Sequence, residues 1–294
     1  MKVLVTGANG FLGQYLCISL ANKGFEVIGI SRGNCKITDL QTIKYQSVDV
    51  TKKEEIKRII KDVKPDIIIH NAAISKPDAC YNDKTECLLQ NVEATKFLVE
   101  ASKKISSYFI YISTDFVFGE NGPHDENTLP APLNFYGESK LMAEKIVVAS
   151  GIGFAIMRPV FIYGEVKNGM RSNFLYWVKT SLENNTAIKV VTDQQRTPTF
   201  VNDICDGIIA MIENRAKGVF HLAGKDILSP YDMAVTVAKV LGLNASLIEP
   251  VTSETFIEPV IRAKRSGLKI DKAIAVLGYN PVSFEEGVRM SFGL

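Results

Sequence analysis

Short apolar runs alternate with longer amphipathic runs through the first half of the chain. β-rich runs occupy residues 2–6, 26–30, 45–48, 66–70 and 108–113. Between these runs, apolar residues recur at helical spacing over residues 10–22, 52–63 and about 85–104. This alternation is typical of a parallel sheet with helices on both faces. It predicts an α/β fold with a doubly wound parallel (Rossmann) sheet, extended by a helix over residues 136–148 and a strand over residues 154–158.

The pattern changes near residue 155, where helical runs become separated by short extended pieces. These runs cover residues 173–183, 202–213 and 230–241, and a final turn lies near residues 284–291. We therefore expect one domain over residues 1–155 and a smaller, mainly helical lobe over residues 156–294. Some segments of the lobe are expected to return to the first domain.

Composition and charge exclude several classes of protein. Of the 294 residues, 46% are hydrophobic and 22% are charged, as in an ordinary soluble enzyme rather than a disordered or fibrous chain. The formal net charge of +2 provides no electrostatic footprint for nucleic acid. The first apolar run ends at Thr6-Gly7, too early for a signal peptide or a membrane span. We therefore expect a cytoplasmic protein with no nucleic-acid or membrane partner.

The spacing of cysteines and histidines gives no sign of a metal site. The five cysteines are odd in number, form no CxxC pair and lie far in sequence from the three histidines. We therefore expect neither a zinc site nor a disulfide framework. The cysteines are Cys17, Cys35, Cys80, Cys87 and Cys205.

A glycine-rich turn follows the first predicted strand and opens the first predicted helix. Its residues are Gly7, Ala8, Asn9, Gly10, Phe11, Leu12 and Gly13. The first glycine allows a tight turn, the second lets pyrophosphate approach the backbone, and the third lets the helix pack closely on the strand. The free N–H groups and the dipole at the helix N-terminus both favour a phosphate there. Residues 1–155 are thus expected to bind a dinucleotide, and a turn without a ligand is the alternative.

The end of the second predicted strand indicates the type of cofactor. An Asp or Glu normally binds the adenosine ribose at this place, but here the strand ends in Ser31-Arg32. Arg32 could contact a 2′-phosphate, so we expect NADP(H) to be preferred. NAD(H) stays an alternative if Arg32 is only a solvated loop residue. Two more segments follow predicted strands at the ligand-binding edge of the sheet, namely Asp49-Val50 and Asn71-Ala72-Ala73. Each segment could contact the cofactor or could simply form a turn.

A tyrosine and a lysine stand four positions apart at the start of a predicted helix. Tyr136 and Lys140 would share one helix face, so the ammonium would lie near the phenol. A free phenol has a pKa of about 10, and a nearby cation should lower it and make Tyr136 a general acid/base. Thr114 directly follows the fifth predicted strand, and its hydroxyl could donate to a substrate oxygen. A surface Tyr with a solvated Lys is the alternative for the pair taken alone.

In this order the motifs resemble those of the extended short-chain dehydrogenase/reductase superfamily and, within it, of the dTDP-4-dehydrorhamnose reductases. The matching pieces are TGANGFLG (6–13), HNAA (70–73), QNV (90–92), STDFVFGENGPHDE (113–126), PLNFYGESKL (132–141), RPVFIYG (158–164), NF (173–174), DQQRTPTFVNDI (193–204) and GVFHLAG (218–224). The resemblance implies hydride transfer between a nicotinamide and carbon 4 of a nucleotide-linked sugar. It also implies that the lobe binds the substrate, and the superfamily is commonly homodimeric.

The resemblance assigns roles to particular residues. It implies that Thr114, Tyr136 and Lys140 are catalytic, that Lys140 also binds the nicotinamide ribose, and that Asn91 belongs to the cofactor site. The implied substrate-binding residues are Thr114, Asp115, Phe116, Arg158, Asn173 and Arg196.

Departures from the reductase pattern leave the sugar, the nucleotide and two alternatives open. Arg196 lies in a segment where the reductases usually have a glycine, and Lys264-Arg265-Ser266 replaces their usual Pro-x-Asn. A dehydratase is disfavoured because Phe116 stands where a second acid is needed. A 4-epimerase stays open, although no ribose-binding carboxylate favours retained NAD. A non-catalytic NADP-binding module, similar to the regulatory subunit of methionine adenosyltransferase, also stays open.

Overall fold

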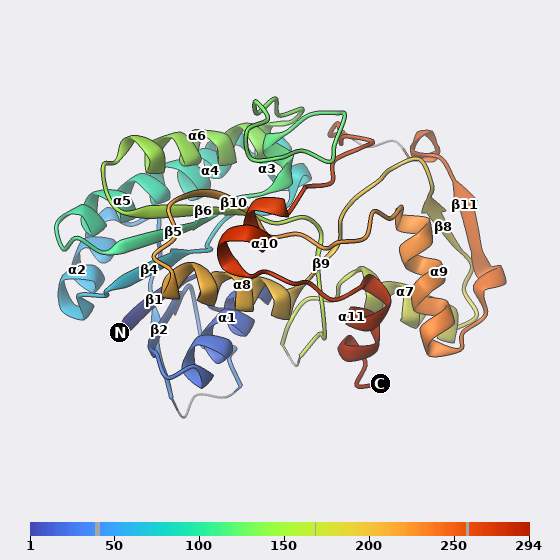
Figure 1. The fold of residues 1–294 in the computed structure, drawn as a ribbon, viewed down its shortest axis with the longest axis horizontal. Helices are drawn as coiled ribbons and strands as arrows, with labels where there is room; N and C mark the ends of the chain where they lie inside the picture. Colours follow the sequence, from blue (N-terminus) through green and yellow to red (C-terminus); the bar gives the residue numbers. More distant parts are fainter. Residues whose placement is uncertain (39–41, 168, 257–258) are drawn as a thin grey trace.

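A seven-stranded parallel sheet forms the centre of the first domain (Figure 1). The structure, a computed structural model, describes all residues except 39–41, 168 and 257–258. The strand order is β10-β6-β5-β4-β1-β2-β3. Successive strands are added on one side of β1 up to β3 and on its other side from β4 onward, and open α/β sheets bind ligands at such a switch point between β1 and β4. The predicted doubly wound sheet is confirmed. Its strands are β1 (Lys2–Thr6), β2 (Glu26–Ser31), β3 (Ile43–Ser47), β4 (Ile67–His70), β5 (Tyr108–Ile112), β6 (Phe154–Arg158) and β10 (Gly218–His221).

Helices cover both faces of this sheet (Figure 1). One face carries α1 (Phe11–Asn22) and α8 (Val201–Glu213). The other face carries α2 (Lys53–Val63), α5 (Ala94–Lys103) and α6 (Phe135–Ala149). Both α8 and the edge strand β10 come from the second half of the chain, so that half contributes to the sheet and to its cover.

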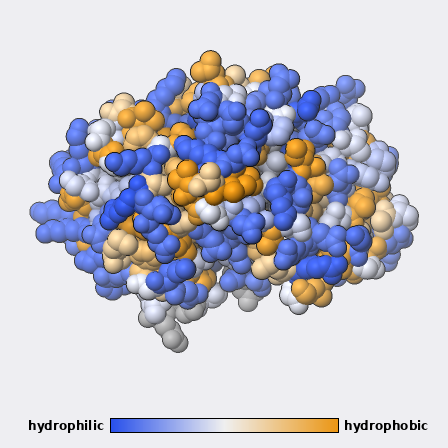
Figure 2. All heavy atoms as spheres, viewed as in Figure 1, coloured by the Kyte–Doolittle hydropathy of each residue, from blue (hydrophilic) through white to orange (hydrophobic). Residues whose placement is uncertain are grey.

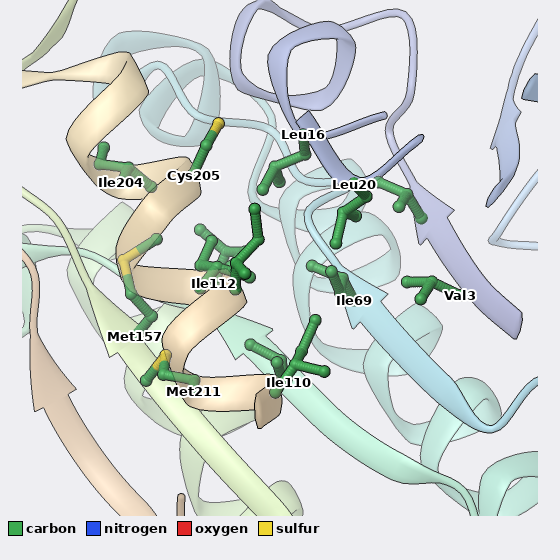
Figure 3. Packing of buried hydrophobic residues seen from close by; sticks show 14 of the residues in the cluster. Val3, Leu16, Leu20, Ile69, Ile110, Ile112, Met157, Ile204, Cys205 and Met211 are labelled. Carbon is green, nitrogen blue, oxygen red and sulfur yellow. The ribbon is translucent and has the colours of Figure 1, made fainter. Parts of the chain in front are cut away.

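The two cores follow from the alternation of side chains along each strand. Val3 belongs to the core beneath α1 and α8, whereas its neighbour Leu4 belongs to the core on the opposite face. Figure 3 shows the first core, where Leu16 of α1 and Met211 of α8 lie over the strands. Because both faces are buried, inner strands such as β1, β4 and β5 read as nearly continuous apolar runs, whereas the edge strand β3 is mostly polar.

The helix predicted over residues 85–104 is interrupted. It consists of α4 (Lys84–Leu88), a π-helical turn (Leu89–Glu93) and α5, and the short helix α3 (Pro77–Asn82) precedes it. Asn91 lies in the π turn, and its side chain bonds both backbone groups of Ile74. Such turns occur frequently at functional sites, and spacing alone did not predict this one.

The smaller lobe is built around three helices and two short parallel strand pairs. The helices are α7 (Phe174–Glu183), α9 (Pro230–Leu241) and α11 (Phe284–Ser291). The strand pairs are β8 (Ile188–Val191) with β11 (Ile248–Val251), and β7 (Ile162–Tyr163) with β9 (Thr199–Phe200). The start of α9 shows why these helices form, because Ser229 and Asp232 make a capping box there. The predicted final turn is a full helix, α11, capped by Ser283.

The described surface is mixed in character. No helix among the described residues is both long enough and apolar enough to cross a membrane. Figure 2 shows hydrophilic residues over most of the visible face, with an apolar patch near its centre. In Figure 1 this place is occupied by α10 (Asp271–Leu277), on which Ile274 and Val276 are about half exposed.

Candidate active site

The glycine turn is packed too tightly for side chains. Gly7 has φ +67°, and a Cβ there would lie 2.9 Å from the backbone of Ala72. A Cβ on Gly13 would collide with the carbonyl oxygen of Gly7. Helix α1 begins directly after Gly10, and no side chain caps its N-terminus. The turn therefore presents bare N–H groups at a helix N-terminus, which fits the pyrophosphate of a dinucleotide.

Asn9 of this turn has a structural role that its position in the motif did not reveal. Its Oδ1 accepts from the N–H of Lys36 at 2.9 Å, and its Nδ2 donates to the carbonyl oxygen of Asn34 at 2.9 Å. These bonds hold the loop after β2, in which Arg32 is exposed, and Ser31 at the end of β2 is half-buried. The other two motif residues lie on α1, where Leu12 is buried and Phe11 is half-buried.

Asp49 uses its carboxylate in a local turn. Its Oδ1 accepts from the N–H of Thr51 at 3.0 Å and from the Thr51 hydroxyl at 2.8 Å. Burial raises the pKa of Asp49, but the Thr51 hydrogen bonds and the charge of Arg32 outweigh it and lower the pKa overall. Turn chemistry thus accounts for this carboxylate. The adjacent Val50 is buried in the core beneath α2.

A buried hydrogen-bond chain supports the segment after β4. Thr6 Oγ1 accepts from the N–H groups of Asn71 and Ala72 at 3.1 and 3.0 Å, and it bonds His70 Nδ1 at 2.8 Å. His70 Nε2 bonds Thr95 Oγ1 at 3.0 Å. Burial and then the charge of Lys140 lower the pKa of His70 to about 3, so the ring is neutral. The chain fixes the backbone facing Gly7, and Ala73 is half-buried beside it.

Tyr136 and Thr114 meet at the carboxyl end of β5. Only 6% of Tyr136 is exposed, and its phenol interacts with Thr114 closely enough to affect its pKa. Burial raises the pKa of Tyr136 above its ordinary value, while the interaction with Thr114 opposes the rise. The predicted lowering of this pKa by Lys140 is therefore wrong for the structure as it stands, because burial dominates.

Lys140 lies one helical turn further along α6 and is also buried. Its Nζ donates to the carbonyl oxygen of Ile112 at 2.7 Å and lies 4.3 Å from the ring centre of Tyr111. Burial lowers the pKa of Lys140 to about 7, although Glu144 raises it. The amine can thus gain or lose a proton near neutral pH.

Asp115, Phe116 and Arg196 line a small cavity beside Thr114. Thr114 Oγ1 donates to Asp115 Oδ1 at 3.1 Å. Burial raises the pKa of Asp115, while the charge of Arg196 and a hydrogen bond from Ser266 lower it. Arg196 donates to Ser266 Oγ at 2.8 Å and to the carbonyl oxygen of Ala263 at 3.2 Å, so it holds two segments of the second half of the chain together at this cavity. The remaining lining residues are Phe118, Leu133, Asn134, Arg262, Ala263 and Ser266. None of them was named as a substrate-binding residue, although Ser266 lies in one of the two segments that depart from the reductase pattern.

Arg158 and Asn173 have partners within the protein. Arg158 donates to Glu144 through Nε at 2.9 Å and Nη2 at 2.6 Å, and both side chains are buried. Asn173 caps α7 by accepting from the N–H of Tyr176 at 3.2 Å, and it donates to the carbonyl oxygen of Gly164 at 2.8 Å. Their substrate contacts stay predictions.

A larger open groove of about 830 Å³ lies on the lobe, between residues 225–228 and the start of α11. It contains none of the predicted site residues. The larger groove and the predicted catalytic groups therefore lie in different places. We favour the buried site at β5 as the active site because its groups can transfer protons.

The expectation of no disulfide is wrong for one pair of cysteines. Cys80 of α3 and Cys87 of α4 form a disulfide with a Cα–Cα distance of 5.0 Å. Their spacing of seven positions matches no common motif, so only the fold brings them together. Among the described residues, no group of three His, Cys, Asp or Glu could hold a metal ion.

Comparisons with known proteins agree with this architecture. The RmlD substrate binding domain family matches residues 1–292. Methionine adenosyltransferase 2 subunit beta of Pongo abelii is 32% identical over 270 residues, which are 90% of this chain and 78% of that protein.

Two solved structures share the fold over nearly the whole chain. The dTDP-4-dehydrorhamnose reductase of Bacillus anthracis, in complex with NADP, is 27% identical with a TM-score of 0.87, covering 99% of this chain and 98% of its own. The UDP-glucuronic acid 4-epimerase of Bacillus cereus, in complex with UDP-glucuronic acid and NAD, is 26% identical with a TM-score of 0.86, covering 100% and 98%.

Proposed function

Because the chain belongs to the RmlD substrate binding domain family, we propose that it is an NADPH-dependent reductase of a 4-keto sugar nucleotide. Its broader class is that of the nicotinamide-dependent oxidoreductases. The observation that carries the proposal is the grouping of Tyr136, Thr114 and Lys140 at the carboxyl end of β5, close to the reversal of the sheet. That edge is where folds of this kind bind ligands.

The chain offers suitable residues for NADP(H). The uncapped N-terminus of α1 would bind the pyrophosphate, and the exposed Arg32 would pair with the 2′-phosphate. Lys140 would bind the nicotinamide ribose. When bound, the nicotinamide supplies the hydride.

Tyr136 would supply the proton. Reduction turns the carbonyl oxygen into an alkoxide, which is more basic than a phenolate, so a phenol with a raised pKa still transfers its proton. Thr114, which lies beside the phenol, would hold the carbonyl oxygen within reach. Lys140 would stabilise the phenolate that remains, since its pKa of about 7 leaves it partly charged at neutral pH.

Asp115 and Arg196 would orient the sugar. Their opposite charges lie together at the cavity, and each can bond hydroxyl groups while the other balances its charge. Elimination of water needs a second acid at position 116, which is Phe. We therefore expect no 4,6-dehydration of dTDP-glucose, and formation of the 4-keto-6-deoxy product would contradict this expectation.

A non-catalytic NADP-binding subunit is the second candidate. It is favoured by the similarity to methionine adenosyltransferase 2 subunit beta and by the Gln194-Gln195-Arg196 run. In this structure Arg196 donates to the side-chain oxygen of Gln194 at 2.7 Å and also faces the cavity. The run thus contributes to the same site that the reductase proposal uses.

The deciding experiment is NADPH oxidation with a panel of 4-keto sugar nucleotides. Steady turnover with one of them supports the reductase. Tight NADPH binding without turnover supports the subunit. Interconversion of 4-epimers without net use of added cofactor, by a protein that retains NAD through purification, supports an epimerase.

A further inference from the structure

The Cys80–Cys87 disulfide lies directly beneath the proposed general acid. Both cysteines have no exposed surface, and with Tyr136 they form one buried cluster, flanked by Phe116 and Phe135. Cys87 Sγ lies 3.4 Å from the hydroxyl of Ser139, which is on α6 one turn after Tyr136. The sulfur atoms therefore contact the helix that carries the catalytic pair.

The pair also touches the π turn. Asn91 Nδ2 lies 3.5 Å from Cys87 Sγ and 3.8 Å from Cys80 Sγ, and it donates to Ser139 Oγ at 3.0 Å. Ser139 Oγ in turn donates to the carbonyl oxygen of Tyr136 at 2.7 Å. A continuous set of contacts thus runs from the sulfurs to the backbone of Tyr136.

Helix α3 connects the same pair to the cavity. Asp78 of α3 accepts from Arg262 Nη2 at 2.8 Å, and Arg262 lines the cavity beside Asp115. Cys80 lies two positions after Asp78 on this short helix, whose outer residues are exposed. The position of α3 therefore affects both the Tyr136 side and the Arg262 side of the site.

We propose that Cys80 and Cys87 form a reversible redox site that controls the reactivity of Tyr136, with the disulfide as the active state. This proposal rests on the proposed function. In thiol–disulfide exchange, a small dithiol or two thiols reduce the bond: the sulfur–sulfur bond breaks, each cysteine gains one proton and one electron, and the reductant becomes a disulfide. A low-molecular-weight disulfide such as glutathione disulfide reverses the reaction and leaves as two thiols.

Reduction should disturb the site because the cluster is buried. Two separate thiols need more room than one bonded pair, and close-packed interiors accept added volume only by shifting side chains or backbone. Cys87 and Asn91 both contact Ser139, whose hydroxyl bonds the backbone of Tyr136, so such a shift should also move Tyr136. A misplacement of about 1 Å can lower turnover about 10²-fold, so we expect at least a tenfold loss on reduction.

The test uses the whole protein in two redox states. After treatment with glutathione disulfide and then denaturation, a thiol reagent should detect three thiols, those of Cys17, Cys35 and Cys205, and after treatment with dithiothreitol it should detect all five. Hydrogen–deuterium exchange should rise on reduction over residues 77–91 and 135–140. NADPH-dependent turnover should fall at least tenfold and recover on reoxidation.

Variants separate this effect from general destabilisation. The Cys80→Ser/Cys87→Ser double variant should have a turnover that does not respond to either reagent. Cys205→Ala, which removes a buried thiol from α8, should keep the redox response of the unmodified protein.

Several outcomes would overturn the proposal. Five thiols after oxidation would show that the bond does not form. Equal exchange and equal turnover in both states would show a bond with no effect on the site. If no sugar nucleotide is turned over, the proposed function fails, and hydrogen–deuterium exchange alone tests the redox site. Unchanged hydrogen–deuterium exchange over residues 77–91 and 135–140 on reduction overturns the redox proposal. Increased exchange over these residues supports it.

Discussion

The replacement Tyr136→Phe tests the proposed proton transfer most directly. It removes only the phenolic oxygen, and the ring keeps its edge-on contact with Phe116 at 5.4 Å between centroids. The interaction of the buried hydroxyl with Thr114 is lost, which should cost about 1 kcal/mol of unfolding free energy. Turnover should fall by about 10²–10⁴-fold, the usual contribution of general acid catalysis. That loss corresponds to about 2.7–5.4 kcal/mol in the activation barrier.

The assay compares three quantities in the unmodified and changed proteins. These are turnover at saturating NADPH and sugar nucleotide, the dissociation constant of NADPH, and the unfolding free energy. Tyr279→Phe is the matched control, because Tyr279 is buried and its hydroxyl donates to the carbonyl oxygen of Ala223 at 3.1 Å. It should lose similar stability without the loss of turnover.

The reasoning fails on one clear result. That result is a Tyr136→Phe protein that is folded, binds NADPH normally and retains more than half of the turnover while the chemical step limits the rate. Another group would then supply the proton, and the role given to Tyr136 and Lys140 would be wrong.

Three further predictions concern the cofactor, pH and stability. The unmodified protein should bind NADPH about tenfold or more tightly than NADH, because a charge-assisted bond from Arg32 contributes about 1.5–3 kcal/mol. Arg32→Ala should remove most of that preference in binding titrations. Equal dissociation constants for NADPH and NADH in the unmodified protein would refute the predicted preference. Burial lowers the pKa of Lys140 from 10.5 to about 7, so the unfolded chain holds the extra proton between these values. Unfolding free energy should therefore rise with pH across this window, and Lys140→Met should reduce the slope in urea titrations. Glu144→Gln leaves the buried charge of Arg158 without a counter-charge and should lower the unfolding free energy by about 3–5 kcal/mol, whereas an unchanged Tm in thermal unfolding contradicts this.

Local patterns were enough for most of the fold. The strand over Lys2–Thr6, the glycine turn and the helix starting near Tyr136 each depend on neighbours within a few positions. Periodicity and chain stereochemistry govern such elements. The π turn at Asn91 is an exception, because the side chain that accompanies it bonds Ile74, seventeen positions earlier.

By itself, the sequence determined the parallel sheet, the uncapped glycine turn and the four-position spacing that puts Tyr136 and Lys140 on one helix. The tertiary structure alone decided how these groups behave. Burial sets the pKa of Lys140 near 7, and the fold places Arg196 and Asp115 at one cavity and joins Cys80 to Cys87. The physical reason is that hydrophobic periodicity in the sequence indicates which residues are buried. Desolvation, charge pairing and disulfide formation depend instead on which side chains surround each buried group in the folded protein.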